Sequence, residues 1–312
     1  MIRTIAPAKI NWTLEVLGKR PDGYHEVRTV MQTIDLCDEI TLSPAPDLRQ
    51  RARPHPDPSP GDIVARVFPH SLHCASDVDL PGDSGLTPYY ATQLLDPEGE
   101  RDVRISLTKR IPVAAGLGGG SSDAAATLRG LDRLWELGLP GEELARLARE
   151  IGSDVAFFLS GGTALAEGRG ERITPLPDAP EAWLVVVAPP IFMPEKTKRM
   201  YEALRPTDFS DGQRTEALAE RLRQGKRASG KDLFNAFDRA AYESFAGLAT
   251  HRDRLLAAGA KRVHLAGAGP ALFSVHSSRA EAEGTAARLG SEHGRVFVAR
   301  MLGAAEATRI DG

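Results

Sequence analysis

A run of glycines between residues 116 and 120 is the most chemically distinctive feature of the sequence. Four of these five residues are glycine, and Ser121, Ser122 and Asp123 follow directly. Without Cβ atoms the backbone N–H groups can approach a ligand closely, and the start of a helix offers free N–H donors and the positive end of a dipole. An Ala-rich helix pattern follows at once, which favours a phosphate-binding loop over a Gly-rich hairpin or linker. Neither a Walker A motif nor a six-residue dinucleotide fingerprint is present, so a catalytic cation must come from elsewhere.

Two ionisable residues could act on a phosphoryl group held by this loop. Asp154 follows the end of an expected helix and precedes the apolar run 155–159, while Lys9 precedes an alternating strand pattern. A lysine beside a carboxylate would keep it ionised and would neutralise charge that builds on a transferring phosphoryl group. Taken alone, Asp154 could equally be an ordinary helix cap and Lys9 a solvated surface charge.

Three further residues could bind a polar or planar substrate. Asn11 could hydrogen-bond a hydroxyl group, or could simply lie on the strand surface. Tyr24 and His25 follow the turn at 19–23. Tyr24 offers a stacking face for a planar base, and His25 offers ring and backbone groups that could read the edge of the base. The alternative is a Tyr–His pair that packs the turn.

The hydrophobic pattern indicates the elements that must position these residues. It predicts strands at 10–16, 27–34, 39–42, 103–107, 183–188 and 295–301, and a strand, Gly-rich turn and strand over 262–276. Helices are expected at 124–138, 144–151, 196–204, 213–223, 235–258 and 279–290. This order lacks a strict βαβ rhythm, which favours an α+β fold. Residues 44–62 are expected to form a surface loop, 63–98 show no sustained period, and His70–Cys74 is expected to be a loop rather than a metal site.

Composition limits the classes of function. At roughly 150 residues per domain, 312 residues suggest two domains or one two-lobed unit. Lys plus Arg is 39 and Asp plus Glu is 42, so the net charge of −3 gives no overall reason to bind nucleic acid or an acidic membrane. The two cysteines exclude a disulfide scaffold and a four-cysteine zinc site. With no signal peptide or spanning segment apparent, we expect a cytoplasmic protein with no nucleic-acid or membrane partner.

Four ordered segments resemble a known family. Pro112-x3-Gly116-Leu-Gly-Gly-Gly-Ser-Ser122, with the Ala-rich helix after it, resembles the ATP loop of the GHMP kinases. Pro7-Ala-Lys-Ile-Asn11, Pro21-Asp-Gly-Tyr-His25 and Gly152–Phe158 narrow the resemblance, over most of the chain, to the 4-diphosphocytidyl-2-C-methyl-D-erythritol kinases of that superfamily. The resemblance implies a two-lobed α+β GHMP kinase fold with the active site between the lobes. Residues 1–160 would form the N-terminal ATP-binding lobe and residues 161–312 the C-terminal substrate-side lobe.

The resemblance also implies an activity and a set of site residues. The activity is transfer of the γ-phosphoryl group of ATP to the C2 hydroxyl of 4-diphosphocytidyl-2-C-methyl-D-erythritol, in non-mevalonate isoprenoid precursor biosynthesis. Asp154 would be the general base, or would orient the hydroxyl, with Lys9 as its cationic partner. Asn11, Tyr24, His25 and Thr197 would bind the substrate. The residues expected to bind ATP are Pro112, Val113, Ala114, Ala115, Gly116, Leu117, Gly118, Gly119, Gly120, Ser121 and Ser122.

A metal ion and a limited set of partners complete these expectations. Mg²⁺ would bridge the ATP phosphates, held mostly by phosphate and water oxygens, and the sequence does not reveal its protein ligands. The partner would be the small-molecule substrate, with the chain a monomer or a homodimer.

The sequence departs from the family pattern in places, and two other functions stay open. Residues 47–98 lack the family's Asn-Leu-led helix and show Ser84–Thr87 instead. A third glycine motif reads Gly267-Ala-Gly-Pro270, where proline removes a backbone donor, so it could pack against the phosphates or be a plain turn. Asp154-Val-Ala replaces the family's Asp-Val-Pro. A kinase of the homoserine or mevalonate class would need the loop but not Tyr24 and His25, and a non-catalytic nucleotide sensor would lack a working base.

Overall fold

Two long antiparallel strands form a hairpin that runs through the molecule. The computed structural model describes residues 1–45, 63–67, 70–76, 87–228, 231–290 and 294–312. Strands β1 (Ile2–Lys19) and β2 (His25–Pro44) pair from Ile2 opposite Leu42 to Lys19 opposite His25. The strand predicted at 10–16 is therefore part of a longer one, and those predicted at 27–34 and 39–42 are one strand. Register shifts at Pro7/Ala8 and at Asn11/Thr13 flank the stretch that carries Lys9 and Asn11, and such bulges re-aim the side chains beside them.

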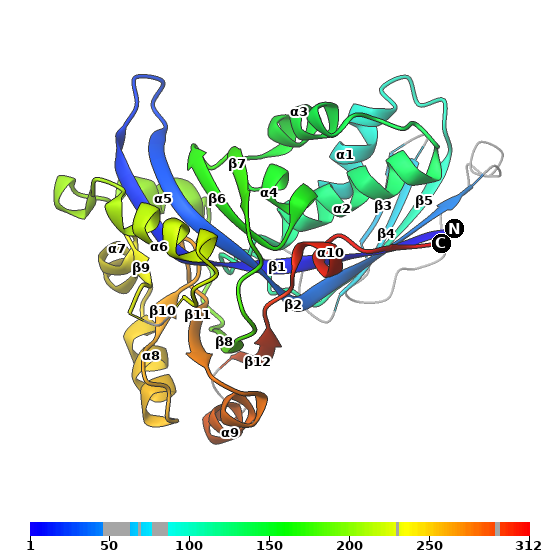
Figure 1. Ribbon diagram of the computed structural model, residues 1–312. Helices are drawn as coiled ribbons and strands as arrows, with labels where there is room; N and C mark the ends of the chain where they lie inside the picture. Colours follow the sequence, from blue (N-terminus) through cyan, green and yellow to red (C-terminus); the bar gives the residue numbers. More distant parts are fainter. Residues whose placement is uncertain (46–62, 68–69, 77–86, 229–230, 291–293) are drawn as a thin grey trace.

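Among the described residues, this hairpin is the centre of a nine-stranded sheet, most of whose strands are labelled in Figure 1. The main path is β13 (Ile310–Asp311), β1, β2, β5 (Val103–Lys109), β4 (His70–Ser76) and β3 (Ile63–Val67). Strand β6 (Thr163–Gly168) pairs with β2 and with β7 (Arg172–Leu176), and β9 (Phe234–Asn235) pairs with β1. The loop predicted at His70–Cys74 is wrong, because these residues belong to β4, which runs parallel to β5. The pairing partner, rather than apolar alternation, makes this segment a strand. The loop predicted at 44–62 lies mostly outside the described residues.

Four helices pack together with this sheet (Figure 1). They are α1 (Thr87–Leu95), α2 (Gly119–Leu134), α3 (Gly141–Ile151) and α4 (Val155–Ser160). Ala124, Ala125, Phe157 and Phe158 are fully or almost fully buried in a core that also takes in residues of β2 and β6. The small alanines let α2 approach the sheet closely. The two phenylalanines of α4 fill the space beside α2, and this packing fixes the position of α4.

The second half of the chain forms a separate four-stranded antiparallel sheet. Its order is β10 (His264–Leu265), β11 (Leu272–His276), β8 (Trp183–Ala188) and β12 (Arg295–Arg300). Helices α8 (Leu248–Ala257) and α9 (Arg279–Leu289) share a buried apolar cluster with β8. The strands predicted at 183–188 and 295–301 and the helix predicted at 279–290 are confirmed.

The single helix predicted at 235–258 is wrong. Strand β9 occupies Phe234–Asn235, and the rest divides into α7 (Asp238–Ser244) and α8, separated by a turn at 245–247. A long apolar pattern continued across the turn because both helices bury residues in the same half of the molecule, among them Ala240, Ala241 and Leu248. The short helices α5 (Lys196–Glu202) and α6 (Gln213–Arg223) are confirmed, while η1 (Pro206–Asp208) and α10 (Ala304–Ala307) were not expected.

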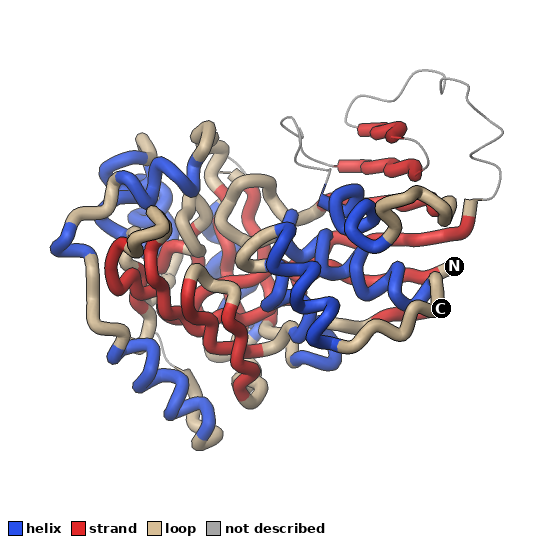
Figure 2. Tube along the Cα trace, turned by 90° about the horizontal axis from the view of Figure 1, so that it is seen from above, coloured by secondary structure: helices blue, strands red, loops and turns tan. Residues whose placement is uncertain are grey.

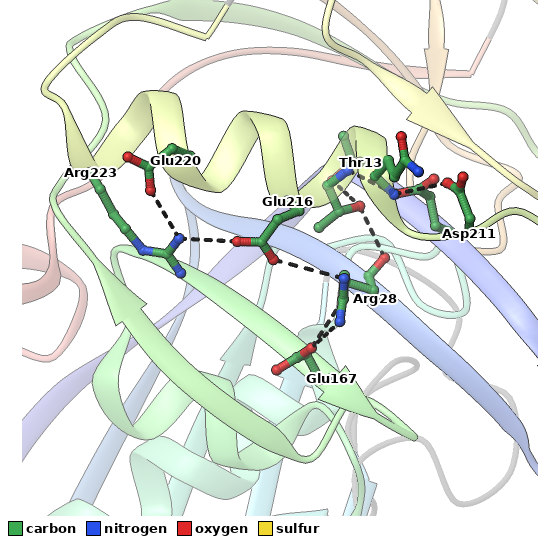
Figure 3. Close-up of polar contacts among 10 residues, drawn as sticks. Thr13, Arg28, Glu167, Asp211, Glu216, Glu220 and Arg223 are labelled. Atoms are coloured by element: carbon green, nitrogen blue, oxygen red, sulfur yellow. Dashed lines mark hydrogen bonds and ion pairs between the residues drawn. The ribbon is translucent and has the colours of Figure 1, made fainter.

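Helix α6 is fixed to the hairpin by a network of charged and hydroxyl groups (Figure 3). Arg28 on β2 pairs with Glu167, its direct cross-strand partner on β6, at 3.0 Å, and with Glu216 on α6 at 3.8 Å. Beneath these ions, the buried Thr215 hydroxyl donates to Oγ1 of Thr13 on β1 at 2.9 Å. The network holds α6 against β2 and against β1, the strand that carries Lys9 and Asn11.

The mixture of two sheets and packed helices confirms the α+β class. The views in Figures 1 and 2 show the N- and C-termini close together, at the end of the molecule away from α8 and α9. Within the described ranges, no helix has both the length and the apolar character needed to cross a membrane.

Candidate active site

A cleft of about 1580 Å³ collects the residues singled out in the sequence. Its walls come from β1, the glycine loop, the start of α4, α5 and the turn between β10 and β11. All the predicted site residues line it except Ser122: Lys9, Asn11, Tyr24, His25, residues 112–121, Asp154 and Thr197. Segments separated by more than a hundred residues in the sequence therefore meet at one place.

Lys9 and Asp154 form an ion pair in this cleft. The two groups lie 3.6 Å apart, Nζ to Oδ2, with the lysine side chain 6% exposed and the aspartate side chain 36% exposed. Lys9 Nζ also donates to Oδ1 of Asn11 at 2.8 Å. Asp154 directly precedes α4, but its side chain accepts no capping hydrogen bond from that helix, all of whose residues are described. The carboxylate is thus not a cap, and it lines the cleft beside Lys9.

The glycine loop turns into helix earlier than expected. Helix α2 begins at Gly119 rather than near Ala124, so the last glycines and the two serines form its first turn. The first N–H groups of a helix have no partner within it. Here that first turn, which is the positive end of the helix dipole, lines the cleft. Gly118 has φ 75°, and a Cβ there would lie 2.8 Å from the Phe158 ring and 3.0 Å from Cγ of Lys9. Only glycine fits at this position, where the loop passes between the lysine and α4.

Ser122 is placed differently from the rest of the loop. Its Oγ is buried and has no hydrogen-bond partner among the described residues. The serine is therefore part of the first turn of α2 but lies beneath the lining of the cleft, while Ser121 lines it.

The third glycine motif of the family pattern, Gly267–Pro270, packs directly on the glycine loop at 116–120. A Cβ on Gly116 would lie 2.1 Å from the carbonyl oxygen of Ala266, and the Ala271 N–H donates to the Ala115 carbonyl at 3.0 Å. Gly267 and Ala268 line the cleft. The segment is therefore more than a turn between two strands, because its backbone fixes the loop that follows β5.

Aromatic residues gather at the other end of the cleft. The Arg169 guanidinium lies 4.7 Å from the ring centroid of Tyr24, which is 55% exposed. His25 stacks on Tyr201 with centroids 4.8 Å apart. Burial, together with the charge of Lys19, lowers the pKa of His25, so this imidazole is neutral at pH 7 and can both donate and accept a hydrogen bond. Tyr24 and His25 thus have separate neighbours and do not behave as a turn-packing pair.

Sequence reasoning missed a buried lysine at the glycine-loop end. Lys109 Nζ donates to Asp38 at 2.5 Å and to Asp123 at 2.6 Å, and all three side chains are almost fully buried. Burial favours a neutral lysine, but the two carboxylates outweigh it and raise the pKa of Lys109. Burial also raises the pKa of Asp123. Lys109 lies 3.3 Å from where a Cβ on Gly119 would be. In the sequence it is one polar residue of an alternating strand, which gives no signal.

Other cleft residues also escaped notice. Phe192, Arg169 and Lys196 line the cleft. Lys196 lies next to Thr197, the only residue of that segment that the sequence singled out. Single exposed-looking residues of this kind carry no pattern, so only the fold reveals where they point.

Comparison with known proteins agrees with this geometry. Residues 87–162 match the model of the GHMP kinases N terminal domain. The chain is 38% identical to a 4-diphosphocytidyl-2-C-methyl-D-erythritol kinase of Dehalococcoides mccartyi, over 97% of this chain and 99% of that protein. It is 40% identical to the kinase of the same name from Geobacillus thermodenitrificans, over 96% of both chains.

Solved structures give the same result at the level of fold. A crystal structure of 4-(cytidine 5'-diphospho)-2C-methyl-D-erythritol kinase matches with a TM-score of 0.74 at 34% identity, covering 96% of this chain and 99% of that one. Homoserine kinase from Cytophaga hutchinsonii shares the fold, with a TM-score of 0.68 at 17% identity over 99% and 97% of the two chains. Identity at this level over nearly the whole length shows that the chain belongs to the 4-diphosphocytidyl-2-C-methyl-D-erythritol kinase family of the GHMP kinases.

Proposed function

We propose that the chain is an ATP-dependent kinase that phosphorylates the C2 hydroxyl of 4-diphosphocytidyl-2-C-methyl-D-erythritol. The observation that carries the proposal is the Lys9–Asp154 pair, 3.6 Å apart in the same cleft as the glycine loop and the Tyr24–His25 turn. The two relatives are named for this activity, and the chain matches them over nearly their whole length.

In this mechanism the glycine loop and the first turn of α2 bind the ATP phosphates. Phosphoryl transfer depends mainly on positioning and on charge neutralisation. The acceptor oxygen attacks the γ-phosphorus, the bond to the ADP oxygen breaks, and the hydroxyl proton passes to Asp154 or is held by it. Lys9, 3.6 Å from Asp154, offsets negative charge on the transferring group.

The acceptor would lie along the aromatic end of the cleft. Tyr24 supplies a stacking face for cytosine, and the neutral His25 supplies a donor and an acceptor for the base edge. Asn11, held by Lys9 on one side and by the Thr29 hydroxyl at 2.8 Å on the other, is oriented toward a substrate hydroxyl. Thr197 at the start of α5 is exposed in the same cleft.

We include Mg²⁺ in the proposal as the ion that neutralises the ATP phosphates. Hard cations take oxygen ligands. Ser121 lines the cleft, and Oγ of Ser122, in the same first turn of α2 just beneath the lining, is an oxygen without a hydrogen-bond partner among the described residues. The serines at the start of this helix therefore fit an oxygen-coordinated ion, whose other ligands would be phosphate and water.

The test is turnover on defined acceptors. The protein is incubated with ATP, Mg²⁺ and either the cytidyl alcohol, homoserine or mevalonate, and ADP formation is followed. We expect turnover with the cytidyl alcohol alone. Turnover only with homoserine or mevalonate would contradict the proposal, and ATP binding without any turnover would favour a nucleotide sensor.

Three expectations stay predictions. They are the lobe boundary at residue 160, the cytoplasmic location, and the monomeric or homodimeric state.

A further inference from the structure

Lys196 places a further lysine side chain in the cleft. It is the first residue of α5, and its Nζ donates to the carbonyl oxygen of Gly269 in the third glycine motif. Lys196 lines the cleft with Lys9 and Asp154 and interacts electrostatically with both. Two lysines therefore lie in the field of one carboxylate, Asp154, where the phosphoryl group would pass to the acceptor.

The surroundings of Lys196 favour its neutral form when no ligand is bound. Burial lowers its pKa to about 7, the charge of Lys9 on β1 acts in the same direction, and Asp154 before α4 opposes them. On its own helix, burial and the charge of Asp154 raise the pKa of Tyr201, so that group is neutral. The neighbouring Glu195 and Lys198 form an ion pair at 3.8 Å. Near neutral pH, Lys196 thus exists as a mixture of amine and ammonium.

We propose that Lys196 is a second phosphate-binding cation of the transfer centre, which takes up a proton when the triphosphate of ATP enters the cleft. This rests on the proposed function. A triphosphate adds several negative charges within reach of the amine, and nearby anions favour the ammonium form. The proton comes from solvent, and no covalent bond changes. Lys9 is already committed to Asp154 and Asn11, so the second cation would offset charge that Lys9 alone leaves unbalanced.

Calorimetry of nucleotide binding tests this. A non-hydrolysable ATP analogue with Mg²⁺ is titrated into the full chain at pH 7.5, in two buffers of different ionisation enthalpy. Proton changes on the nucleotide itself are common to all variants and cancel in the comparison. We expect the wild type to take up more protons than Lys196→Met and Lys196→Arg. Lys196→Arg keeps its charge at every pH and should still bind, while Lys196→Met should bind about tenfold more weakly, as loss of a charged hydrogen bond predicts.

The pH dependence gives a second readout. Above pH 7 the affinity of the wild type should fall, by up to about tenfold per pH unit, until the pKa of the bound state is reached. Lys196→Arg should show no such fall. A purely structural role through the Gly269 carbonyl would not produce this difference between two cations. Lys261→Met is the matched control, because Lys261 is 83% exposed and lies outside the cleft.

Two results would overturn the proposal. One is unchanged proton uptake in both Lys196 variants, and the other is wild-type affinity in a folded Lys196→Met, as judged by its melting temperature. If turnover on the cytidyl alcohol depends on Asp154 but neither uptake nor affinity depends on Lys196, this inference fails while the kinase function stands. If proton uptake depends on Lys196 but no acceptor is phosphorylated, the assigned function fails instead.

Discussion

At the scale of single residues, the proposed reaction depends on the position of Asp154. The carboxylate lies 3.6 Å from Lys9, and Lys9 is held in turn by Asn11 at 2.8 Å. A general base must lie within reach of the acceptor hydroxyl, and Asp154, 36% exposed beside Lys9, lines the cleft where that hydroxyl would bind.

Asp154→Asn should lower kcat by about 10²–10⁴-fold, the usual range for loss of a general base. The amide keeps the shape of the side chain, so ATP affinity should stay close to the wild-type value. Steady-state kinetics and nucleotide titration measure the two effects. Near-normal turnover would remove Asp154 from the mechanism.

Tyr24→Ala should raise the KM for the cytidyl alcohol more than the KM for ATP. The exposed ring lies under Arg169 at the aromatic end of the cleft, where it can stack on a base. Tyr90→Ala is the matched control, since Tyr90 is 47% exposed and does not line the cleft. Equal changes in both KM values would indicate a structural role for Tyr24.

Some residues of the site could be predicted from the sequence and others could not. Lys9, Asp154 and the glycine loop lie in short ordered segments with a recognisable spacing, and the cleft brings them together. Lys109 and Lys196 carry no such pattern. Their importance comes from burial beside particular charges, and burial of a lysine depends on contacts between distant segments rather than on its neighbours in sequence.

At the scale of elements, two helices differ from the expected structure for identifiable reasons. Helix α2 begins five residues before Ala124 because glycines, which are poor helix formers in a helix interior, cost less in a first turn with free N–H groups. The prediction of a helix at 235–258 is wrong at its start because of a contact with a distant part of the chain. There Phe234 and Asn235 pair with Thr13 and Leu14 of β1, and this long-range contact cannot be read from periodicity.

Helix α7 makes stability depend on pH through Asp238, its first residue. Burial raises the pKa of this carboxyl to about 6, above its ordinary value. The folded state therefore holds a proton that the unfolded state has lost, so this contribution to stability is full below pH 4 and is lost as the pH rises to about 6.

Asp238→Asn should therefore raise the melting temperature at pH 7.5 and change it much less at pH 4. Thermal unfolding at the two pH values measures this. Asp253→Asn, at an exposed position on α8, serves as the comparison. An equal gain for Asp238→Asn at both pH values would contradict the titration of Asp238.

At the scale of the whole molecule, the contact between the glycine loop and the turn at 266–271 is one of the places where the two sheets meet. Ala115 and Gly116 belong to the loop after β5 of the first sheet, and Ala266 and Ala271 flank the turn between β10 and β11 of the second. Neither sheet order nor this contact follows from the hydrophobic pattern, which predicts elements and an α+β class but not which edges touch.

Gly116→Ala should disrupt this contact. A Cβ there would lie 2.1 Å from a backbone oxygen, and Gly116 has φ 90°, which an alanine adopts only with strain. We expect the free energy of unfolding to fall by at least about 1–3 kcal/mol and ATP binding to be lost. Gly141→Ala is the control, since nothing lies within 4 Å of the added methyl group. Chemical denaturation and nucleotide titration measure both, and a wild-type profile for Gly116→Ala would exclude the contact.

The contact between the two glycine loops is made largely by main-chain atoms, and this has an evolutionary consequence. A replacement at this contact either adds side-chain atoms that clash, as at Gly116, or leaves its amides and carbonyls where they are. Substitutions that change which alcohol is accepted should therefore fall at the aromatic end of the cleft, where side chains such as Tyr24 and His25 form the wall. Such a fold can change its acceptor at the aromatic end of the cleft while the glycine-loop end stays the same.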